Sequence, residues 1–146
     1  MPAVYPIVWT PPAVTGWYEN LQRRDVAVWE RFLRAHGSLF DAVAYNVAVG
    51  GLLPEAQEPD DIGALGWKYS TALKIDALAR EQGLTWAIEV KAQASVSAIG
   101  AAIAYPLMLA REEPDLPIAG GAIVCGHLPP DFAWLVEQLR VRVWVV

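Results

Sequence analysis

One segment near the middle of the chain carries four charged side chains whose spacing suits metal chemistry. A two-residue turn at Gln82-Gly83 makes this segment a β-hairpin, and in that register Asp76 faces Glu89. Lys74 then faces Lys91, two residues along on the same side. Facing side chains have Cβ atoms roughly 4.5–5.5 Å apart, and two carboxylates at that separation repel each other unless a cation lies between them. The spacing therefore predicts a divalent-metal site with a lysine beside it.

An exposed, salt-bridged hairpin is the alternative interpretation of the same charges. Pairs of opposite charge across two strands contribute about 0.2–1 kcal/mol each without any bound metal. The apolar residues favour the metal site, because in the same register they all fall on the opposite face of the hairpin, which we expect to be the buried one: Ile75, Ala77, Ala79, Trp86, Ile88 and Val90.

Length and composition indicate one domain, which we place at residues 15–146 of the 146-residue chain. Residues 1–14 are rich in proline and predict an extended N-terminal arm. The hydrophobic fraction is 55%, yet no stretch reaches the about 18–20 uninterrupted apolar residues of a membrane span. The chain shows no export signal, and its single cysteine, Cys125, cannot form an internal disulfide. We therefore expect a cytoplasmic protein, or a virion-associated one if its role is structural.

The charge of the whole protein does not favour tight, nonspecific binding of nucleic acid, since the formal net charge is −5. The arginines are nevertheless concentrated, because Arg23, Arg24, Arg31 and Arg34 lie in one predicted helix. They could form a local basic face within an acidic protein, or simply the solvated side of that helix. The sequence leaves both interpretations open.

The remaining pattern places the hairpin inside an α/β (α+β) fold with a mixed sheet. Apolar spacing and capping residues predict helices over residues 17–36, 95–111 and 130–140, with Thr15 as the N-cap of the first. Alternating or continuously apolar runs predict strands over residues 39–49, 67–79, 84–91, 119–125 and 141–146, with a loop over residues 52–66. Strands joined by the hairpin are antiparallel, whereas strands joined through a helix are expected to be parallel.

This order of elements, together with the hairpin, resembles the restriction-endonuclease-like superfamily of PD-(D/E)xK nucleases. That superfamily has an α-β-β-β-α-β core, with an Asp on the second core strand and an (Asp/Glu)-x-Lys tripeptide on the third. Asp76 matches the first acid and Glu89-Val90-Lys91 matches the tripeptide. The resemblance covers about residues 17–126, and the last helix and strand form a C-terminal extension.

Two departures from the family pattern stand out. Asp76 follows Ile75 where the motif has proline, and Pro59-Asp60 is a rival first acid, but it lies in a predicted loop without a strand to position it. Some branches carry Gln-x-x-x-Tyr on the following helix. Here Tyr105 is present, whereas Ala101 occupies the place of the glutamine, so that branch is not supported.

The resemblance implies a nuclease that hydrolyses phosphodiester bonds of DNA with Mg²⁺ or Mn²⁺. Asp76, Glu89 and the backbone carbonyl of Val90 would hold the metal through oxygen ligands. Lys91 would orient or help deprotonate the attacking water, or offset charge on the phosphate, and Lys74 would act on Lys91 by like-charge repulsion.

A further acidic residue and a second class of function remain to be weighed. Glu30, on the first predicted helix, could supply the additional carboxylate that some members of the superfamily use, or it could be an ordinary surface residue. The protein could also be a catalytically inactive member of the fold, such as a structural or assembly component of a phage particle. Under either function we expect a homo-oligomer or a larger assembly.

Overall fold

The strands form one five-stranded sheet in a computed structural model that describes residues 6–51 and 62–146. Their order across the sheet follows the chain: β1 (Ala42–Val49), β2 (Leu73–Glu81), β3 (Leu84–Gln93), β4 (Ile118–His127) and β5 (Arg142–Val145). β2 is antiparallel to both β1 and β3, whereas β4 is parallel to both β3 and β5. The predicted mixed α/β sheet is confirmed.

The hairpin formed by β2 and β3 has the predicted turn and register. Gln82 and Gly83 form the turn with φ values of 50° and 81°, the positive angles that the favoured two-residue hairpin turns require. The ladder pairs Ala77 with Ile88 and Ala79 with Trp86, as that turn demands.

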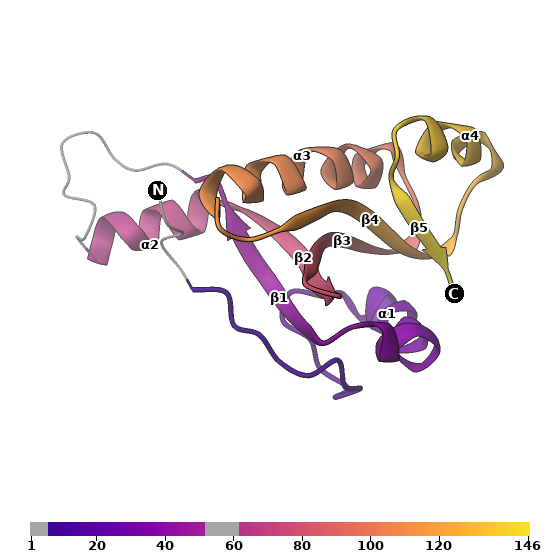
Figure 1. Ribbon diagram of the computed structural model, residues 1–146, viewed down its shortest axis with the longest axis horizontal. Coiled ribbons are helices and arrows are strands. Elements are labelled where there is room, and N and C mark those ends of the chain that lie inside the picture. Colours follow the sequence, from indigo (N-terminus) through magenta and orange to yellow (C-terminus); the bar gives the residue numbers. More distant parts are fainter. Residues whose placement is uncertain (1–5, 52–61) are drawn as a thin grey trace.

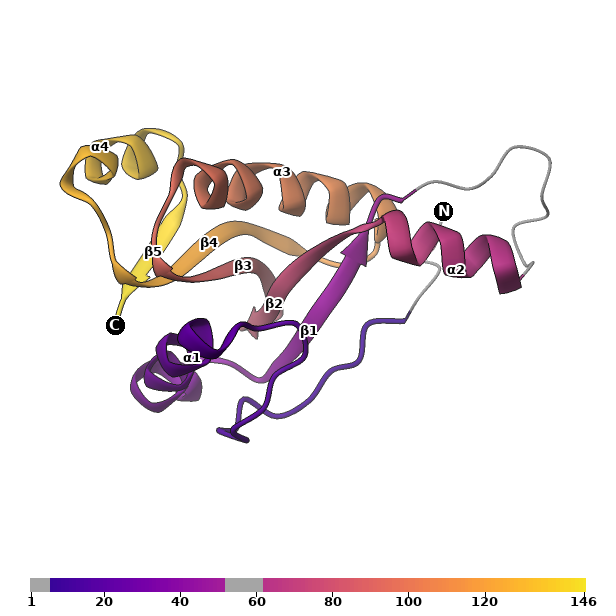
Figure 2. The ribbon, with the colours of Figure 1, turned by 180° about the vertical axis from the view of Figure 1, so that it is seen from behind.

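Helices cover both faces of the sheet (Figures 1 and 2). The helix α1 (Arg23–His36) lies on one face, while α3 (Val96–Glu112) and α4 (Pro130–Gln138) lie on the other. The helix α2 (Ile62–Thr71) precedes β2, and a short 3₁₀ helix, η1 (Gly37–Leu39), follows α1. With helices on both sides, the central strands are buried on both faces. None of the described helices has the length and apolar content needed to cross a lipid bilayer.

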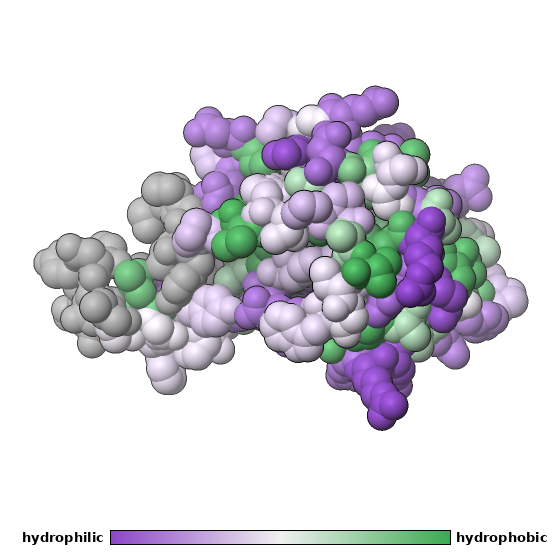
Figure 3. Space-filling view, turned by 90° about the horizontal axis from the view of Figure 1, so that it is seen from below, coloured by the Kyte–Doolittle hydropathy of each residue, from purple (hydrophilic) through white to green (hydrophobic). Residues whose placement is uncertain are grey.

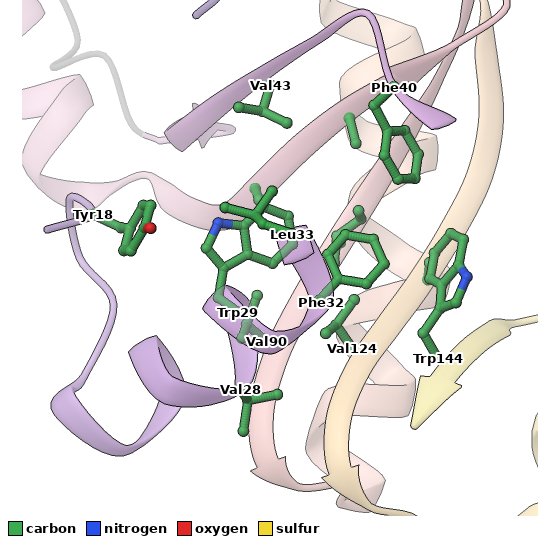
Figure 4. Packing of buried hydrophobic residues seen from close by; sticks show 14 residues of the cluster. Tyr18, Val28, Trp29, Phe32, Leu33, Phe40, Val43, Val90, Val124 and Trp144 are labelled. Atoms are coloured by element: carbon green, nitrogen blue, oxygen red, sulfur yellow. The ribbon is translucent and has the colours of Figure 1, made fainter. Parts of the chain in front are cut away.

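Aromatic side chains of α1 form the core on that side of the sheet (Figure 4). Trp29 and Phe32 are fully buried, and the centre of the Phe32 ring lies 5.1 Å from the centre of the Trp144 ring on β5. The indole Nε1 of Trp29 donates a hydrogen bond to the Tyr45 hydroxyl at 2.9 Å, so its one polar atom is satisfied. Val90 packs into the same cluster. This packing holds α1 directly against the strand with the predicted acid-x-Lys tripeptide.

On the other face, α3 approaches β4 very closely at Gly121. A Cβ atom built on Gly121 would lie only 1.6 Å from the Ala102 carbonyl oxygen, so only glycine permits this approach. The helix begins as predicted, because the Ser95 side chain caps it by accepting a hydrogen bond from the Ala98 amide at 3.1 Å. The close contact places α3 over the face of β3 that carries Glu89.

The first helix begins later than predicted, and Thr15 is not its N-cap. Gln22 occupies the N-cap position. Before it, Gly16 has a φ of 80°, and the Tyr18 hydroxyl accepts a hydrogen bond from the Thr15 amide at 2.9 Å. Tyr18 is buried in the core, and the chain bends to bury it before the helix starts.

The strand predicted over residues 67–79 is wrong in its first part, which belongs to α2. Trp67 favours strands by intrinsic preference, but tertiary contacts outweigh that preference. The Lys68 ammonium donates a hydrogen bond to the Gly50 carbonyl at 2.6 Å, which ties α2 to the end of β1. Of the predicted loop, residues 52–61 lie outside the described residues, and the remainder forms the start of α2.

The N-terminal arm lies along the outer edge of β1. Thr10 and Val43 exchange two backbone hydrogen bonds, of 2.7 and 2.8 Å. The guanidinium of Arg80 lies 5.1 Å from the centre of the Trp9 ring. The arm thus covers this edge of the sheet at one point, whereas the first five residues of the predicted arm lie outside the described part of the chain.

Candidate active site

The site is built where β2 and β3 separate. Their backbone ladder ends at the pair Ala77–Ile88, and beyond it the Asp76 carboxylate oxygen Oδ2 accepts a hydrogen bond from the Val90 amide at 2.9 Å. Figures 1 and 2 show β1 and β2 running at a large angle to β3 and β4. We call this point, between Asp76 on one strand and Glu89-Val90-Lys91 on the other, the β2–β3 fork.

Three of the predicted site residues meet at the fork. The Lys91 ammonium lies 3.6 Å from Asp76 Oδ2 and 3.9 Å from Glu89 Oε2. Asp76 is only 7% exposed and Glu89 only 6%. Within the described residues the second carboxylate oxygen of Glu89, Oε1, is buried without a hydrogen-bond partner. One lysine is thus shared by two buried carboxylates.

The burial of this face corrects the expectation that only the opposite face of the hairpin is buried. Alternation does place Ala77 and Ile88 in the core under α1, but α3 covers the face that carries the carboxylates (Figures 1 and 2). The carboxylates of Asp76 and Glu89 therefore lie inside the protein rather than on a solvated surface.

The environment raises the pKa of both carboxyl groups. Burial, and then the negative charge of Asp76, raise the pKa of Glu89 to about 8, against the opposing effect of Lys91. Burial also raises the pKa of Asp76, opposed by the Val90 amide and Lys91 and reinforced by the charge of Asp25. The pair therefore holds a proton near neutral pH when Lys91 is the only cation beside it.

A third carboxylate, which the sequence interpretation missed, reaches the fork from the other face of the sheet. Asp25, in the first turn of α1, is 4% exposed, and its Oδ1 accepts a hydrogen bond from the Ala92 amide at 2.9 Å. The sequence does hold a signal for it. Asp25 precedes Val28, Trp29 and Phe32 by three, four and seven residues, so it shares their buried helix face.

The two predicted accessory residues lie elsewhere. Glu30 forms an ion pair with Arg34 at 3.1 Å with 17% of its side chain exposed, so it is a half-buried partner of Arg34 rather than a residue of the fork. Lys74 pairs with Ala48 of β1, and the ladder between β2 and β3 does not extend as far as Lys74. The Lys74 ammonium donates hydrogen bonds to the carbonyl oxygens of Tyr69 and Ala72, so the predicted approach to Lys91 is wrong.

Tyr105 of α3 lies on the helix that covers the carboxylates. Its pKa is raised first by burial and then by the negative charges of Glu89 and Asp76. The tyrosine noted in the sequence is therefore within electrostatic reach of the fork.

The oxygen atoms at the fork suit a hard divalent cation. In residues 6–51 and 62–146 no group of three or more His, Cys, Asp or Glu side chains is placed to hold a metal. Mg²⁺, however, commonly uses only one or two carboxylates and keeps several waters. The unpartnered Glu89 Oε1 and the repulsion between Glu89 and Asp76 are what a cation at this point would relieve. The residues present therefore fit Mg²⁺ or Mn²⁺.

Comparison with known proteins identifies no relative, since no protein-family model, no curated protein and no solved structure matches the chain.

Proposed function

We propose that the protein is a metal-dependent nuclease that hydrolyses phosphodiester bonds of DNA. The observation that carries the proposal is the pair of buried carboxylates, Asp76 and Glu89, that shares Lys91 at the β2–β3 fork. The resemblance of Asp76 and Glu89-Val90-Lys91 to the PD-(D/E)xK motif supports it further.

A purely structural role explains this arrangement poorly. Burial of a charged carboxylate destabilises a fold unless it is fully paired. Here two carboxylates share one lysine, and Glu89 Oε1 has no partner among the described residues. Carboxyl groups with strongly shifted pKa values are concentrated at functional sites, where groups needed for activity often lower the stability of the fold.

Each residue at the fork has a distinct part in the proposed reaction. Asp76, Glu89 and the Val90 carbonyl would hold the metal, which when bound polarises the phosphodiester and lowers the pKa of a water. The Val90 amide fixes the orientation of the Asp76 carboxylate. The Lys91 side chain is 36% exposed, so its ammonium can reach outward to orient the attacking water and to offset the negative charge that develops on the phosphate.

Cleavage of a DNA panel tests this proposal directly. Plasmid, linear, single-stranded and branched DNA are incubated with Mg²⁺ or Mn²⁺ and with wild type, Lys91→Ala or Glu89→Gln. The expected result is cleavage that requires the metal and falls by at least about 10²-fold in both variants. Cleavage that is undiminished in Lys91→Ala and Glu89→Gln, or that persists without metal, would exclude the fork as the active site.

A non-catalytic role in a larger assembly is the second candidate function. It is favoured by apolar side chains that face solvent in the described structure, above all Trp17 (74% exposed), Leu107 (70%) and Trp134 (63%). Metal affinity separates the two candidates. An active fork binds Mn²⁺ with an affinity that Asp76→Asn and Glu89→Gln both weaken, whereas a purely structural protein gives the same weak binding in all three forms.

A further inference from the structure

The outer face of α1 carries a row of arginines. At 3.6 residues per turn, Arg23, Arg24, Arg31 and Arg34 fall within about 100° of arc around the helix axis, and all of them are exposed. The buried residues Val28, Trp29, Phe32 and Leu33 occupy the opposite side. The four arginines therefore share one exposed face of α1, which both interpretations of the sequence allow. We call these four residues the arginine row.

Much of the positive charge of the arginine row is not neutralised within the protein. Arg34 pairs with Glu30, and Arg31 donates a hydrogen bond to an oxygen of Val146, the last residue of the sequence, at 3.2 Å. In the described parts of the chain, no acidic side chain forms an ion pair with Arg23 or Arg24. Figure 3, which views the molecule from the α1 side, shows strongly hydrophilic residues projecting at the end that holds α1. This is a concentrated positive surface on a protein whose net charge is −5.

Asp25 connects the N-terminal end of the row to the candidate active site. Arg23 and Arg24 directly precede Asp25 in the sequence. The Asp25 carboxylate accepts a hydrogen bond from the amide of Ala92, the residue after Lys91. The span from residue 23 to residue 34 extends along the helix for roughly 16 Å, at about 1.5 Å per residue. That length matches about five base-pair steps of a duplex backbone, whose phosphates are about 3.4 Å apart per strand along the axis.

We propose that the arginine row binds the phosphate backbone of nucleic acid and leads it to the β2–β3 fork. This inference rests on the proposed nuclease function for the identity of its partner. Guanidinium groups bind phosphates through paired hydrogen bonds, and a row that contacts only phosphates holds the strand without reading its sequence.

The composition of this helix face distinguishes nucleic acid from a membrane surface. A helix that lies on an anionic membrane needs bulky apolar residues beside its basic ones. Between the arginines, the exposed residues of α1 are the small Ala27 and Ala35, and the partly exposed Glu30 pairs with Arg34. The large apolar side chains Trp29, Phe32 and Leu33 are buried. An acidic protein surface is the remaining polyanion, and the experiment includes it as an outcome.

The test measures binding rather than cleavage, in EDTA, with fluorescently labelled duplex and single-stranded DNA over a range of salt concentrations. The variant Arg23→Gln/Arg24→Gln is compared with Arg111→Gln/Arg140→Gln, which removes the same charge from exposed arginines outside α1. A third variant, Arg23→Lys/Arg24→Lys, keeps the charge of the row. Thermal unfolding of each variant verifies that the fold is retained.

The expected result is that loss of the two row arginines weakens binding about tenfold or more and lowers the slope of log affinity against log salt by about 2. The lysine variant retains the slope, and the control pair has little effect. The inference is overturned if both glutamine pairs weaken DNA binding equally, or if neither does. It is also overturned if the protein binds labelled polyglutamate but does not bind DNA. The proposed nuclease function is tested separately. If the wild type binds DNA through the arginine row but does not cleave it, the nuclease function is contradicted, whereas the binding surface is retained.

Discussion

Asp76 and the backbone of Val90 are joined across two separating strands by a hydrogen bond of 2.9 Å. The carboxylate satisfies an amide that lies beyond the last paired residues of the β2–β3 ladder. A residue proposed to bind metal therefore also stabilises the fold at the point where the sheet opens. This double role makes the type of substitution at Asp76 decisive.

The two neutral substitutions of Asp76 are expected to differ in their effect on stability. Asp76→Ala leaves the Val90 amide without an acceptor and lowers the free energy of unfolding by about 1–3 kcal/mol. Asp76→Asn retains an acceptor oxygen and removes a buried charge, so it unfolds at the same or a higher urea concentration than wild type. Both variants lose metal affinity. Equal stability of the two variants would show that the hydrogen bond to Val90 is unimportant.

The raised pKa of Glu89 makes stability depend on pH. Because the folded state holds its proton up to a pKa of about 8 and the unfolded state only up to about 4.3, the folded protein binds more protons between these values. The free energy of unfolding without metal therefore falls as pH rises through this range, by roughly 2–4 kcal/mol relative to Glu89→Gln. Urea unfolding at about pH 5 and about pH 8.5 in EDTA measures the difference.

The matched control for this experiment is Glu137→Gln, which alters an exposed carboxylate on α4. It should retain the wild-type dependence on pH, whereas Glu89→Gln should flatten it. Parallel pH profiles for wild type and Glu89→Gln would contradict the assignment of the retained proton to the fork.

Metal binding is expected to release a proton at pH 7. The carboxyl pair must lose the proton that burial and mutual repulsion retain on it, and metal ligands bind in their deprotonated form. Calorimetric titration with Mn²⁺ in two buffers of different ionisation enthalpy should give an apparent heat that depends on the buffer. The release should diminish in Glu89→Gln, and the affinity of wild type should rise with pH up to about 8. A heat that does not depend on the buffer would argue against the proposed ligands.

Two glycine substitutions test the packing that covers the site. Gly121→Ala forces a Cβ atom into the Ala102 carbonyl and should destabilise the protein by more than about 3 kcal/mol. Gly100→Ala, in the exposed face of α3, meets no atom within 4 Å and should stabilise it by about 0.5–1 kcal/mol. Thermal unfolding compares the two. A tolerated alanine at position 121 would mean that α3 does not lie this close to β4.

The sequence was sufficient to predict the hairpin and the meeting of Asp76, Glu89 and Lys91, though not the position of Lys74, because the hairpin depends on local features. Alternation and the Gln82-Gly83 turn determine which residues share a face, and the structure has that register from Ala77 to Ile88. Ile75, predicted on the face of Ala77, instead packs in the cluster of Leu78 and Leu109 on the other side of the sheet. The burial of Asp76 and Glu89 could not be read from the hairpin, since it depends on α3, which follows β3 and folds back over it.

Residues that act through distant contacts were harder to predict. Asp25 bonds to a backbone amide 67 residues away, and no local pattern specifies such a partner. Glu30, the other acidic residue of the same helix, pairs with Arg34 instead. The helical periodicity that buries Val28 and Phe32 also buries Asp25, so the position of the carboxylate that reaches the fork is implicit in the pattern of the helix.

The long separation between Asp25 and Ala92 also has a consequence for how the site assembles. The hairpin can close from neighbouring residues on its own, whereas Asp25 arrives only when α1 docks, which must first overcome the entropy of closing a long loop. We therefore expect folding to bring Asp76, Glu89 and Lys91 together before the third carboxylate joins them. Exchange of the Ala92 amide hydrogen with solvent then reports transient detachment of α1, even while the hairpin stays folded.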